Sequence, residues 1–521
     1  MGAIANLTRA SWKGQALSLF NQNATWVVLI AAALVLSRWV LFPEFLTTFD
    51  QINFALAIEH FDPRLHQPQP PGYPVFVALL KLLSFLGITI EAMFLVAALA
   101  LSGLALVLMW LLCERVVGPG YGVVGALLLL FNPAFWLAAI TNPVRLCLAA
   151  GALAVALCVW RACQANDSRW LIAAAAVLGI CMGARPTLGP LLTPLILWAA
   201  WRTKAQWRTI ALAGLFFWLA VATWLPALLH ASGGLAAFLH LLQEYSTQQM
   251  STTSPLFGAR LENTMMMAWK GIAWTGLGAL SWLWAAPFVR RTGFSFLTGP
   301  VPTLLLLWAI PELVSFTVLH VADPDHTLSV VPATCVCGAL VLRAFTRRLS
   351  PVWGTAVIAI CVLLNAGLFL KPISKLTTAS NYRAVRYAAT QITTIMTTIN
   401  RLSAKGPVYA VFDETTTGWR QLSYYEPRTR IIVLLGPRGG PRTARVITGR
   451  HVTHHPIKNG HVQLPACGVA AWVDFFQRPA LSGPVPLESV NSRVYFTPSA
   501  PGMSAEFRGV RFTSDAPCNE I

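Results

Sequence analysis

The chain has 521 residues, of which 56% are hydrophobic and only 11% are charged. A soluble globular protein usually carries about 25% charged residues, so this composition excludes an ordinary soluble protein and indicates one built largely for lipid. The formal net charge of +18 does not indicate nucleic acid as a partner, because the basic residues lie mainly in short loops between apolar runs and in the C-terminal part. In such loops Lys and Arg report membrane orientation.

Eleven apolar runs have spanning or near-spanning length and predict membrane helices. The first follows a polar segment, Met1 to Gln22, without a convincing cleavage site, so we expect an uncleaved first span. A twelfth run, Tyr73 to Gly87, is short and carries Lys81 at its centre, which favours an interfacial or re-entrant helix. The eleven runs are 24–42, 92–112, 121–140, 143–160, 170–184, 187–201, 208–228, 265–289, 299–320, 328–345 and 352–370.

The distribution of basic residues predicts the orientation of these spans. With eleven spans and a cytoplasmic N-terminus, every inside loop is basic, as the positive-inside rule requires. These loops contain Arg115, Arg161 with Arg169, the stretch 202–208, Arg290 with Arg291, and the stretch 343–348. Counting Tyr73 to Gly87 as a span would invert the later loops and break the rule. We therefore expect an inner bacterial membrane protein whose first outside loop is 43–91 and whose C-terminal part is periplasmic.

The polar C-terminal part predicts a separate domain. A polar helical stretch, Asn381 to Arg401, precedes short runs that are typical of strands between Gly and Pro turns: Val408 to Phe412, Arg430 to Leu435 and Ala470 to Phe475. The predicted fold is thus an all-α polytopic bundle over 1–371 with a small extracytoplasmic α+β domain over 372–521. Cys467 and Cys518 are its only cysteines, and they either pair in an oxidising compartment or remain two free thiols.

The first outside loop places a carboxylate, Asp50, just beyond the first span. A helical stretch ending near Glu59 follows, and the turn from His66 to Pro74 is rich in proline. Further short motifs lie at predicted outer span ends: Met182 to Pro186, Ser232 to Leu235, and Leu319 to His326.

This arrangement resembles the GT-C superfamily of integral membrane glycosyltransferases, in the protein O-mannosyltransferase and aminoarabinose-transferase branch. The resemblance implies that Asp50 is a general base that deprotonates an acceptor hydroxyl. The alternative is that Asp50 caps the helix that starts near Gln51. The family often carries a second carboxylate directly after the first, where this chain has Gln51.

A polyprenyl phosphate leaving group would require cations near the outer interface. The candidates for this donor phosphate site are Arg185, Arg145, Arg260 and Lys270, and the alternative for each is an interfacial residue that reaches towards water. The candidate substrate-binding residues are His66, Tyr73, Glu244, Glu312, His320, Asp325 and His326. Glu312 lies inside a span, where it is expected to line the donor groove or to pair with Lys270. We expect no metal site, because the segment from Asp323 to His326 lacks a recognised ligand spacing.

The resulting hypothesis is an inverting glycosyltransferase that uses a lipid-phosphate sugar and no cofactor, with an acceptor that the sequence does not identify. No Gly-rich phosphate loop indicates a nucleotide sugar. One alternative is a membrane transporter or flippase, although the sequence shows no repeats or paired broken helices of the kind many transporters have. The other is a non-catalytic scaffold that kept the fold.

Overall fold

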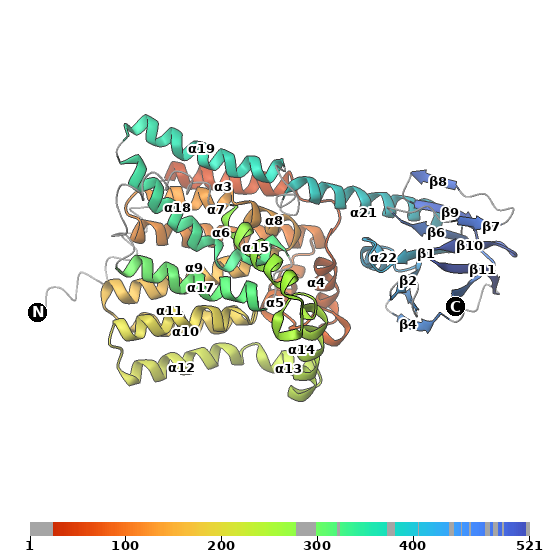
Figure 1. The fold of residues 1–521 in the computed structure, drawn as a ribbon, viewed down its shortest axis with the longest axis horizontal. Helices are drawn as coiled ribbons and strands as arrows, with labels where there is room; N and C mark the ends of the chain where they lie inside the picture. Colours follow the sequence, from red (N-terminus) through yellow and green to blue (C-terminus); the bar gives the residue numbers. More distant parts are fainter. Residues whose placement is uncertain are drawn as a thin grey trace, which may run out of the picture. The chain divides into compact units, whose positions relative to one another are not determined.

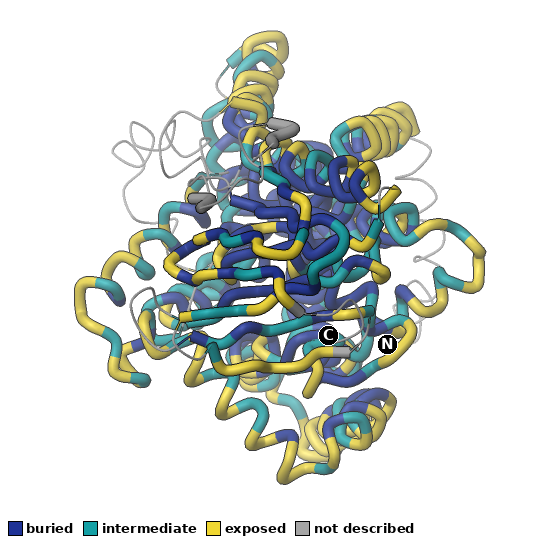
Figure 2. Tube along the Cα trace, turned by 90° about the vertical axis from the view of Figure 1, so that its right-hand side faces the viewer, coloured by how far each residue is buried: buried dark blue, intermediate teal, exposed yellow. Residues whose placement is uncertain are grey.

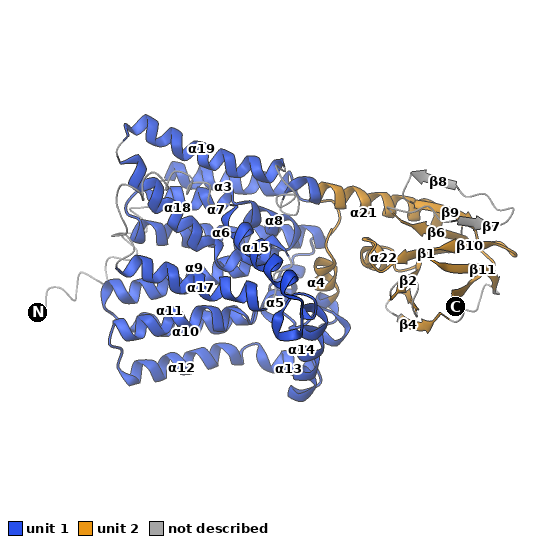
Figure 3. Cartoon of the chain, viewed as in Figure 1, with its two compact units in different colours: residues 1–42, 57–384 blue, residues 43–56, 385–521 orange. Residues whose placement is uncertain are grey.

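The structure is a computed structural model, and its description covers most of the chain from residue 24 onward. The described residues are 24–277, 299–319, 323–347, 349–371, 381–404, 406–436, 442–449, 451–457, 460–474, 480–482, 488–491 and 494–516. The chain forms two compact units, 1–42 with 57–384 and 43–56 with 385–521 (Figure 3). The sequence placed 43–56 with the membrane part, whereas the contacts group it with the C-terminal part.

The first unit is helical, and its long helices run side by side (Figure 1). They are α3 (Ala24–Trp39), α6 (Ile90–Val116), α7 (Tyr121–Leu130), α8 (Pro133–Thr141), α9 (Leu146–Ala165), α10 (Arg169–Met182), α11 (Leu188–Arg202), α12 (Trp207–Ala222), α15 (Leu261–Gly276), α17 (Pro300–Val318), α18 (Val331–Thr346) and α19 (Pro351–Leu370). Shorter elements connect them: α5 (Pro74–Ser84), α13 (Leu225–Ala231), α14 (Leu235–Met250), and the 3-10 turns η1 (Pro63–Leu65), η2 (Pro143–Arg145), η3 (Pro255–Phe257) and η6 (Pro324–Ser329). The helix α4 (Phe49–Glu59) begins in the second unit and ends in the first.

Helices occupy each of the eleven predicted runs as far as these are described. In the described residues, five helices are long and apolar enough to cross a membrane, or six if the bent pair α7 and α8 is one span. The predicted run 265–289 coincides in part with α15, and its residues after 277 lie outside the described residues. The chain is thus a multi-pass membrane protein. The run from Tyr73 to Gly87 contains α5, an apolar helix of 11 residues.

The bend between α7 and α8 has a local cause and a buried cation beside it. The two helices meet at 55°, where Asn132 caps α8 through its side-chain oxygen and Pro133 occupies the first turn. Arg38 of α3 is fully buried, and it donates a hydrogen bond of 2.8 Å to the carbonyl of Leu130 at the end of α7. A cation at a helix C-terminus stabilises the exposed carbonyl groups there. Arg38 therefore stabilises the C-terminal end of α7 at the bend. Its guanidinium also lies 5.1 Å from the ring centroid of Trp136 in α8.

The second unit is a three-layer structure of helices, a mixed sheet and a second sheet. The larger sheet has the order β4-β3-β2-β1-β6-β9-β8, with β1 parallel to β2 and β6, and the smaller has the order β5-β11-β10-β7. The strands are β1 (Val408–Asp413), β2 (Arg430–Leu435), β3 (Thr443–Thr448), β4 (His451–Pro456), β5 (His461–Pro465), β6 (Val469–Val473), β7 (Ala480–Ser482), β8 (Glu488–Asn491), β9 (Val494–Pro498), β10 (Ser504–Phe507) and β11 (Val510–Ala516). The helices are α21 (Tyr382–Ser403) and α22 (Trp419–Tyr425).

The central strands of the larger sheet are buried on both faces (Figure 2). Alternate residues of β1 explain this: Phe412 packs with Ile395 of α21, and Tyr409 packs with Phe512 of the second sheet. The predicted helix and the three predicted strands are confirmed as α21, β1, β2 and β6. The stretch from Gly418 to Pro427 contains the helix α22.

Two buried ion pairs join the sheets at the carboxyl ends of β1 and β6. Arg442 donates to Asp413 at 2.9 Å and to the carbonyl of Arg508 at 2.6 Å, and Arg508 pairs with Asp474. Burial raises the pKa of Asp413, but hydrogen bonds from Thr415 and Arg442 outweigh it, so the pKa lies below its ordinary value. This carboxylate thus stabilises the unit above the ordinary Asp pKa, and that contribution is lost as the pH falls through the lowered pKa.

Replacing Arg442 with Met should destabilise the second unit strongly, because it leaves the Asp413 carboxylate buried without its cation. Breaking such a pair costs about 3–5 kcal/mol. Hydrogen exchange of β1 and β3 in the full chain measures the change, with the exposed Arg511→Gln as the control. Unchanged protection in Arg442→Met would show that the pair does not stabilise the unit.

Candidate functional site

The residues around Asp50 form a helix start of defined geometry. The Thr48 hydroxyl accepts a hydrogen bond from the Gln51 backbone N–H at 3.2 Å, and the Gln51 side-chain oxygen accepts from the Thr48 backbone N–H at 3.1 Å. These reciprocal bonds are a capping box, in which Thr48 is the cap and Gln51 the third helical residue. Asp50 is therefore not the cap of α4, and Gln51 has a structural role at the place where the family often has a carboxylate.

The segment that carries Asp50 packs against α22 within the second unit. Arg420 donates to the Asn53 side-chain oxygen at 3.0 Å, and the Gln421 amide donates to the Thr47 carbonyl at 3.0 Å. Asn53 and Gln421 are both buried. Burial lowers the pKa of Arg420 to about 10, and the nearby charge of Arg445 acts in the same direction.

Tyr73 and Arg185 lie together in the first unit. Arg185 donates a hydrogen bond of 2.9 Å to the Tyr73 hydroxyl, and its guanidinium lies 5.8 Å from the Tyr73 ring centroid. The motif from Met182 to Pro186 explains the proximity, because Val75 donates to the Gly183 carbonyl at 3.1 Å. A Cβ at Gly183 would come within 2.5 Å of the Val75 side chain, so only glycine permits this approach of α5 to the end of α10.

Glu312 is buried in α17 beside η6, and the charge of Arg185 acts on its carboxylate. Its other neighbour is Ser329 at the end of η6, whose carbonyl accepts from Trp308 at 2.7 Å. The sequence offered two roles for Glu312, lining the donor groove or pairing with Lys270, and both remain predictions; Arg185 is a cation near its carboxylate. A carboxylate inside a span is costly unless it meets such a cation.

Arg145 and Asp325, a residue of η6, form an ion pair. The distance from Arg145 Nε to the Asp325 carboxylate is 3.8 Å, and both side chains are only 8% exposed. Asp323, Asp325 and His326 also place one ligand atom each within 4.8 Å of one another, a grouping that the sequence spacing did not predict. Carboxylate and imidazole groups are metal ligands, but Asp325 already has Arg145 as its charge partner.

The remaining predicted residues are Glu244, Arg260, Lys270, His66 and His320. Glu244 is exposed on α14 and pairs with His240 at 3.9 Å, and Arg260 is exposed at the start of α15. Lys270 lies further along α15 and is partly buried. The His66 ring lies 5.9 Å from that of Tyr245, and His320 lies outside the described residues.

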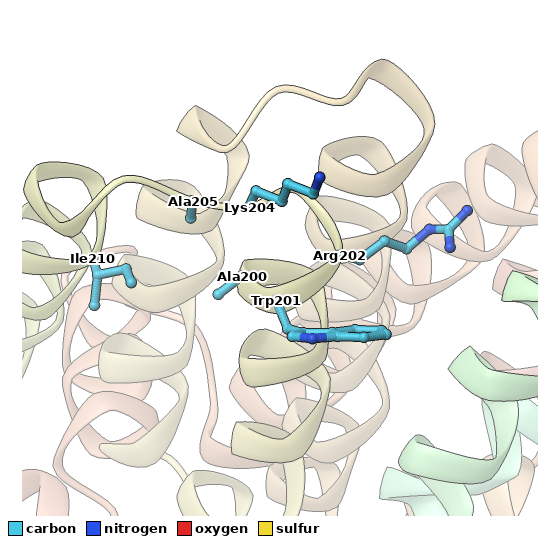
Figure 4. A pocket seen from close by; sticks show the side chains of 6 residues that line it. All are labelled: Ala200, Trp201, Arg202, Lys204, Ala205 and Ile210. Atoms are coloured by element: carbon cyan, nitrogen blue, oxygen red, sulfur yellow. The ribbon is translucent and has the colours of Figure 1, made fainter.

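A cavity of about 570 Å³ lies at the loop between α11 and α12 (Figure 4). It is lined by Ala200, Trp201, Arg202, Lys204, Ala205 and Ile210. None of these residues belongs to the predicted site. Arg202 and Lys204 come from the loop that the sequence predicts to be cytoplasmic, where basic residues are expected for orientation alone.

Sequence reasoning did not identify Arg420 and Asn53 as part of the Asp50 environment, nor Arg38 as a buried cation. Asn53 follows Asp50 by one helical turn, and that spacing was the only signal available for it. Arg420 is distant in sequence, and nothing in its local pattern pointed to Asn53. In the C-terminal unit Cys467 is disulfide-bonded, while Cys518 lies outside the described residues.

Comparisons with known proteins agree with the resemblance found in the sequence. The sequence profile of the family "Dolichyl-phosphate-mannose-protein mannosyltransferase" matches residues 68–232. No curated protein matches the chain in sequence.

The crystal structure of ArnT from Cupriavidus metallidurans bound to undecaprenyl phosphate is similar with a TM-score of 0.55 and 14% identity, over 91% of this chain and 98% of that one. The apo state of the same protein is similar with a TM-score of 0.53 and 16% identity, over the same shares of both chains. The predicted resemblance to the GT-C superfamily of integral membrane glycosyltransferases is thus confirmed, and the chain has the fold of that superfamily.

Proposed function

We propose that the chain transfers a sugar from a polyprenyl-phosphate donor to an acceptor hydroxyl at the outer face of a bacterial inner membrane. The observation that carries the proposal is two cations held by neighbouring side chains, the part-buried Arg185 with Tyr73 and the buried Arg145 with Asp325, in a fold similar to that of ArnT bound to undecaprenyl phosphate. Guanidinium groups are suited to phosphate, because their fork of donors matches its oxygens.

The reaction is an inverting displacement in one step. The acceptor oxygen attacks the anomeric carbon, the bond from that carbon to the phosphate oxygen breaks, and the acceptor proton passes to the Asp50 carboxylate. The leaving polyprenyl phosphate gains negative charge, which Arg185 and Arg145 stabilise. Asp50 supplies the base, and the cations supply electrostatic stabilisation where charge develops.

The test is transfer of radiolabelled sugar by the purified chain in lipid nanodiscs, with a panel of polyprenyl-phosphate sugars as donors and hydroxyl-bearing lipids, peptides and glycans as acceptors. Transfer with inverted anomeric configuration supports the proposal. Uptake or flipping of the labelled lipid without transfer would favour the transporter alternative, and neither activity would favour a scaffold.

Transfer should persist after dialysis against EDTA, because Asp325 is paired with Arg145 and the proposed step needs only the base and the cations. The measurement is the rate of transfer before and after chelation, with Mg²⁺, Mn²⁺ and Zn²⁺ added back. A loss that one ion restores would instead assign a metal to Asp323, Asp325 and His326.

A further inference from the structure

The proposed chemistry does not use the contacts between α22 and the segment 45–53, which carries Asp50. Both belong to the second unit although they lie far apart in the sequence. Three hydrogen bonds connect them: Arg420 to Asn53, Gln421 to the Thr47 carbonyl, and the Leu46 backbone N–H to the Tyr425 hydroxyl at 3.0 Å.

Aromatic contacts reinforce these bonds on the N-terminal side of Asp50. The Phe45 and Tyr425 rings are 5.1 Å apart, and the Phe49 and Trp419 rings are 5.4 Å apart, both edge to face. The guanidinium of Arg420 lies 5.5 Å from the Phe49 ring centroid. The contacts therefore hold residues on both sides of Asp50, from Phe45 and Phe49 before it to Asn53 after it.

The capping box connects these contacts with α22 to the position of the Asp50 carboxylate. Thr48 and Gln51 fix the first turn of α4, and Asp50 lies in that turn. Contacts that hold Thr47 and Asn53 therefore also restrict the position of Asp50. A loop residue without such contacts would lose conformational freedom only when substrate binds. A residue whose position is already fixed by contacts, as proposed for Asp50, is pre-organised for the reaction. Displacements of about 1 Å at a reacting group can cost about 100-fold in rate.

We propose that α22 is a positioning element for Asp50, which makes the C-terminal domain part of the catalytic apparatus through Arg420, Gln421 and Tyr425. This inference rests on the proposed function, in which Asp50 is the base. The three residues are positioning residues, because they act through the segment 45–53.

The experiment compares Arg420→Gln, Arg420→Lys and Tyr425→Phe with the exposed control Arg511→Gln in nanodiscs. Two quantities are measured: hydrogen exchange of a peptide that covers 43–56, and kcat and KM for the lipid donor. We expect Arg420→Gln to speed exchange of that peptide and to lower kcat roughly 10- to 100-fold, with a donor KM that stays within about twofold. Arg420→Lys should recover part of the loss, because it keeps the positive charge and can still donate a hydrogen bond.

A double variant separates positioning from general damage to the fold. If Arg420 acts through Asp50, Asp50→Asn with Arg420→Gln should be no slower than Asp50→Asn alone. Unchanged exchange of 43–56 in Arg420→Gln would overturn the proposal, as would faster exchange with an unchanged kcat. If the unmodified chain transfers no sugar, the proposed function and the catalytic role of α22 both fail, while the exchange data separately decide whether α22 holds the segment.

Discussion

Asp50→Asn should lower the rate of sugar transfer about 1,000-fold while leaving the fold intact. The amide has nearly the shape of the carboxylate but cannot accept the acceptor proton, and general base catalysis contributes about 100- to 10,000-fold. The cap of α4 survives, because Thr48 and Gln51 make it without the Asp50 side chain. The measurement is the single-turnover rate with saturating donor in nanodiscs.

The matched control is Glu44→Gln, which removes another carboxylate from the same loop. Glu44 is exposed, so its loss should leave the rate within about twofold. Hydrogen exchange of 43–56 should be the same in Asp50→Asn and the unmodified chain. Transfer that survives intact in Asp50→Asn would remove this residue from the mechanism, and the base would have to be sought elsewhere.

Arg185→Gln should raise the KM for the polyprenyl-phosphate donor about 30-fold or more. Truncating one partner of a buried, charge-assisted contact costs about 2–5 kcal/mol, and the donor phosphate would lose its cation. Tyr73→Phe removes only the hydroxyl that accepts from Arg185, so the expected change in KM is about two- to tenfold. The control is Arg208→Gln, an exposed cation at the start of α12.

Arg185→Gln could raise the donor KM in two ways: the phosphate loses its cation, or the Glu312 carboxylate loses a nearby positive charge. A second substitution, at Glu312, distinguishes them. Arg185→Gln leaves the buried Glu312 carboxylate without the charge that acts on it. If that were the whole effect, Arg185→Gln combined with Glu312→Gln would bind donor normally. We expect the double variant to keep the raised KM, because the phosphate still lacks its cation.

The helix start at Asp50 illustrates how far local sequence reasoning reached. The pattern predicted a helix after the first span, and α4 is there. The same pattern made Asp50 a candidate cap, and that alternative was wrong, because Thr48 and Gln51 satisfy each other's backbone groups. A capping box is readable from Thr-x-x-Gln.

The candidates for donor-phosphate and substrate binding show what local sequence reasoning could not reach. Arg145, Arg185, Tyr73, Glu312 and Asp325 come from different elements, and two residues of η6 contact two of them: Asp325 pairs with Arg145, and Ser329 lies beside Glu312. Four of them were selected because they lie in outer turns or at predicted outer span ends, and Glu312 because it is a carboxylate inside a span. Glu244 and Arg260 were also selected for their polarity outside the spans, but both are exposed, because polarity alone does not distinguish a residue with a buried partner from one in solvent.

The sequence by itself determined the membrane class, the positions of the apolar helices, the strands β1, β2 and β6, and the resemblance to the GT-C superfamily. These features depend on hydropathy, period and short motifs, which are local properties of the chain. Only the tertiary structure decided that 43–56 packs with the C-terminal unit, that Arg185 donates to Tyr73, and that Arg420 reaches Asn53. Such contacts join residues far apart in the chain, and no local pattern encodes which side chains the packing of helices and sheets brings together.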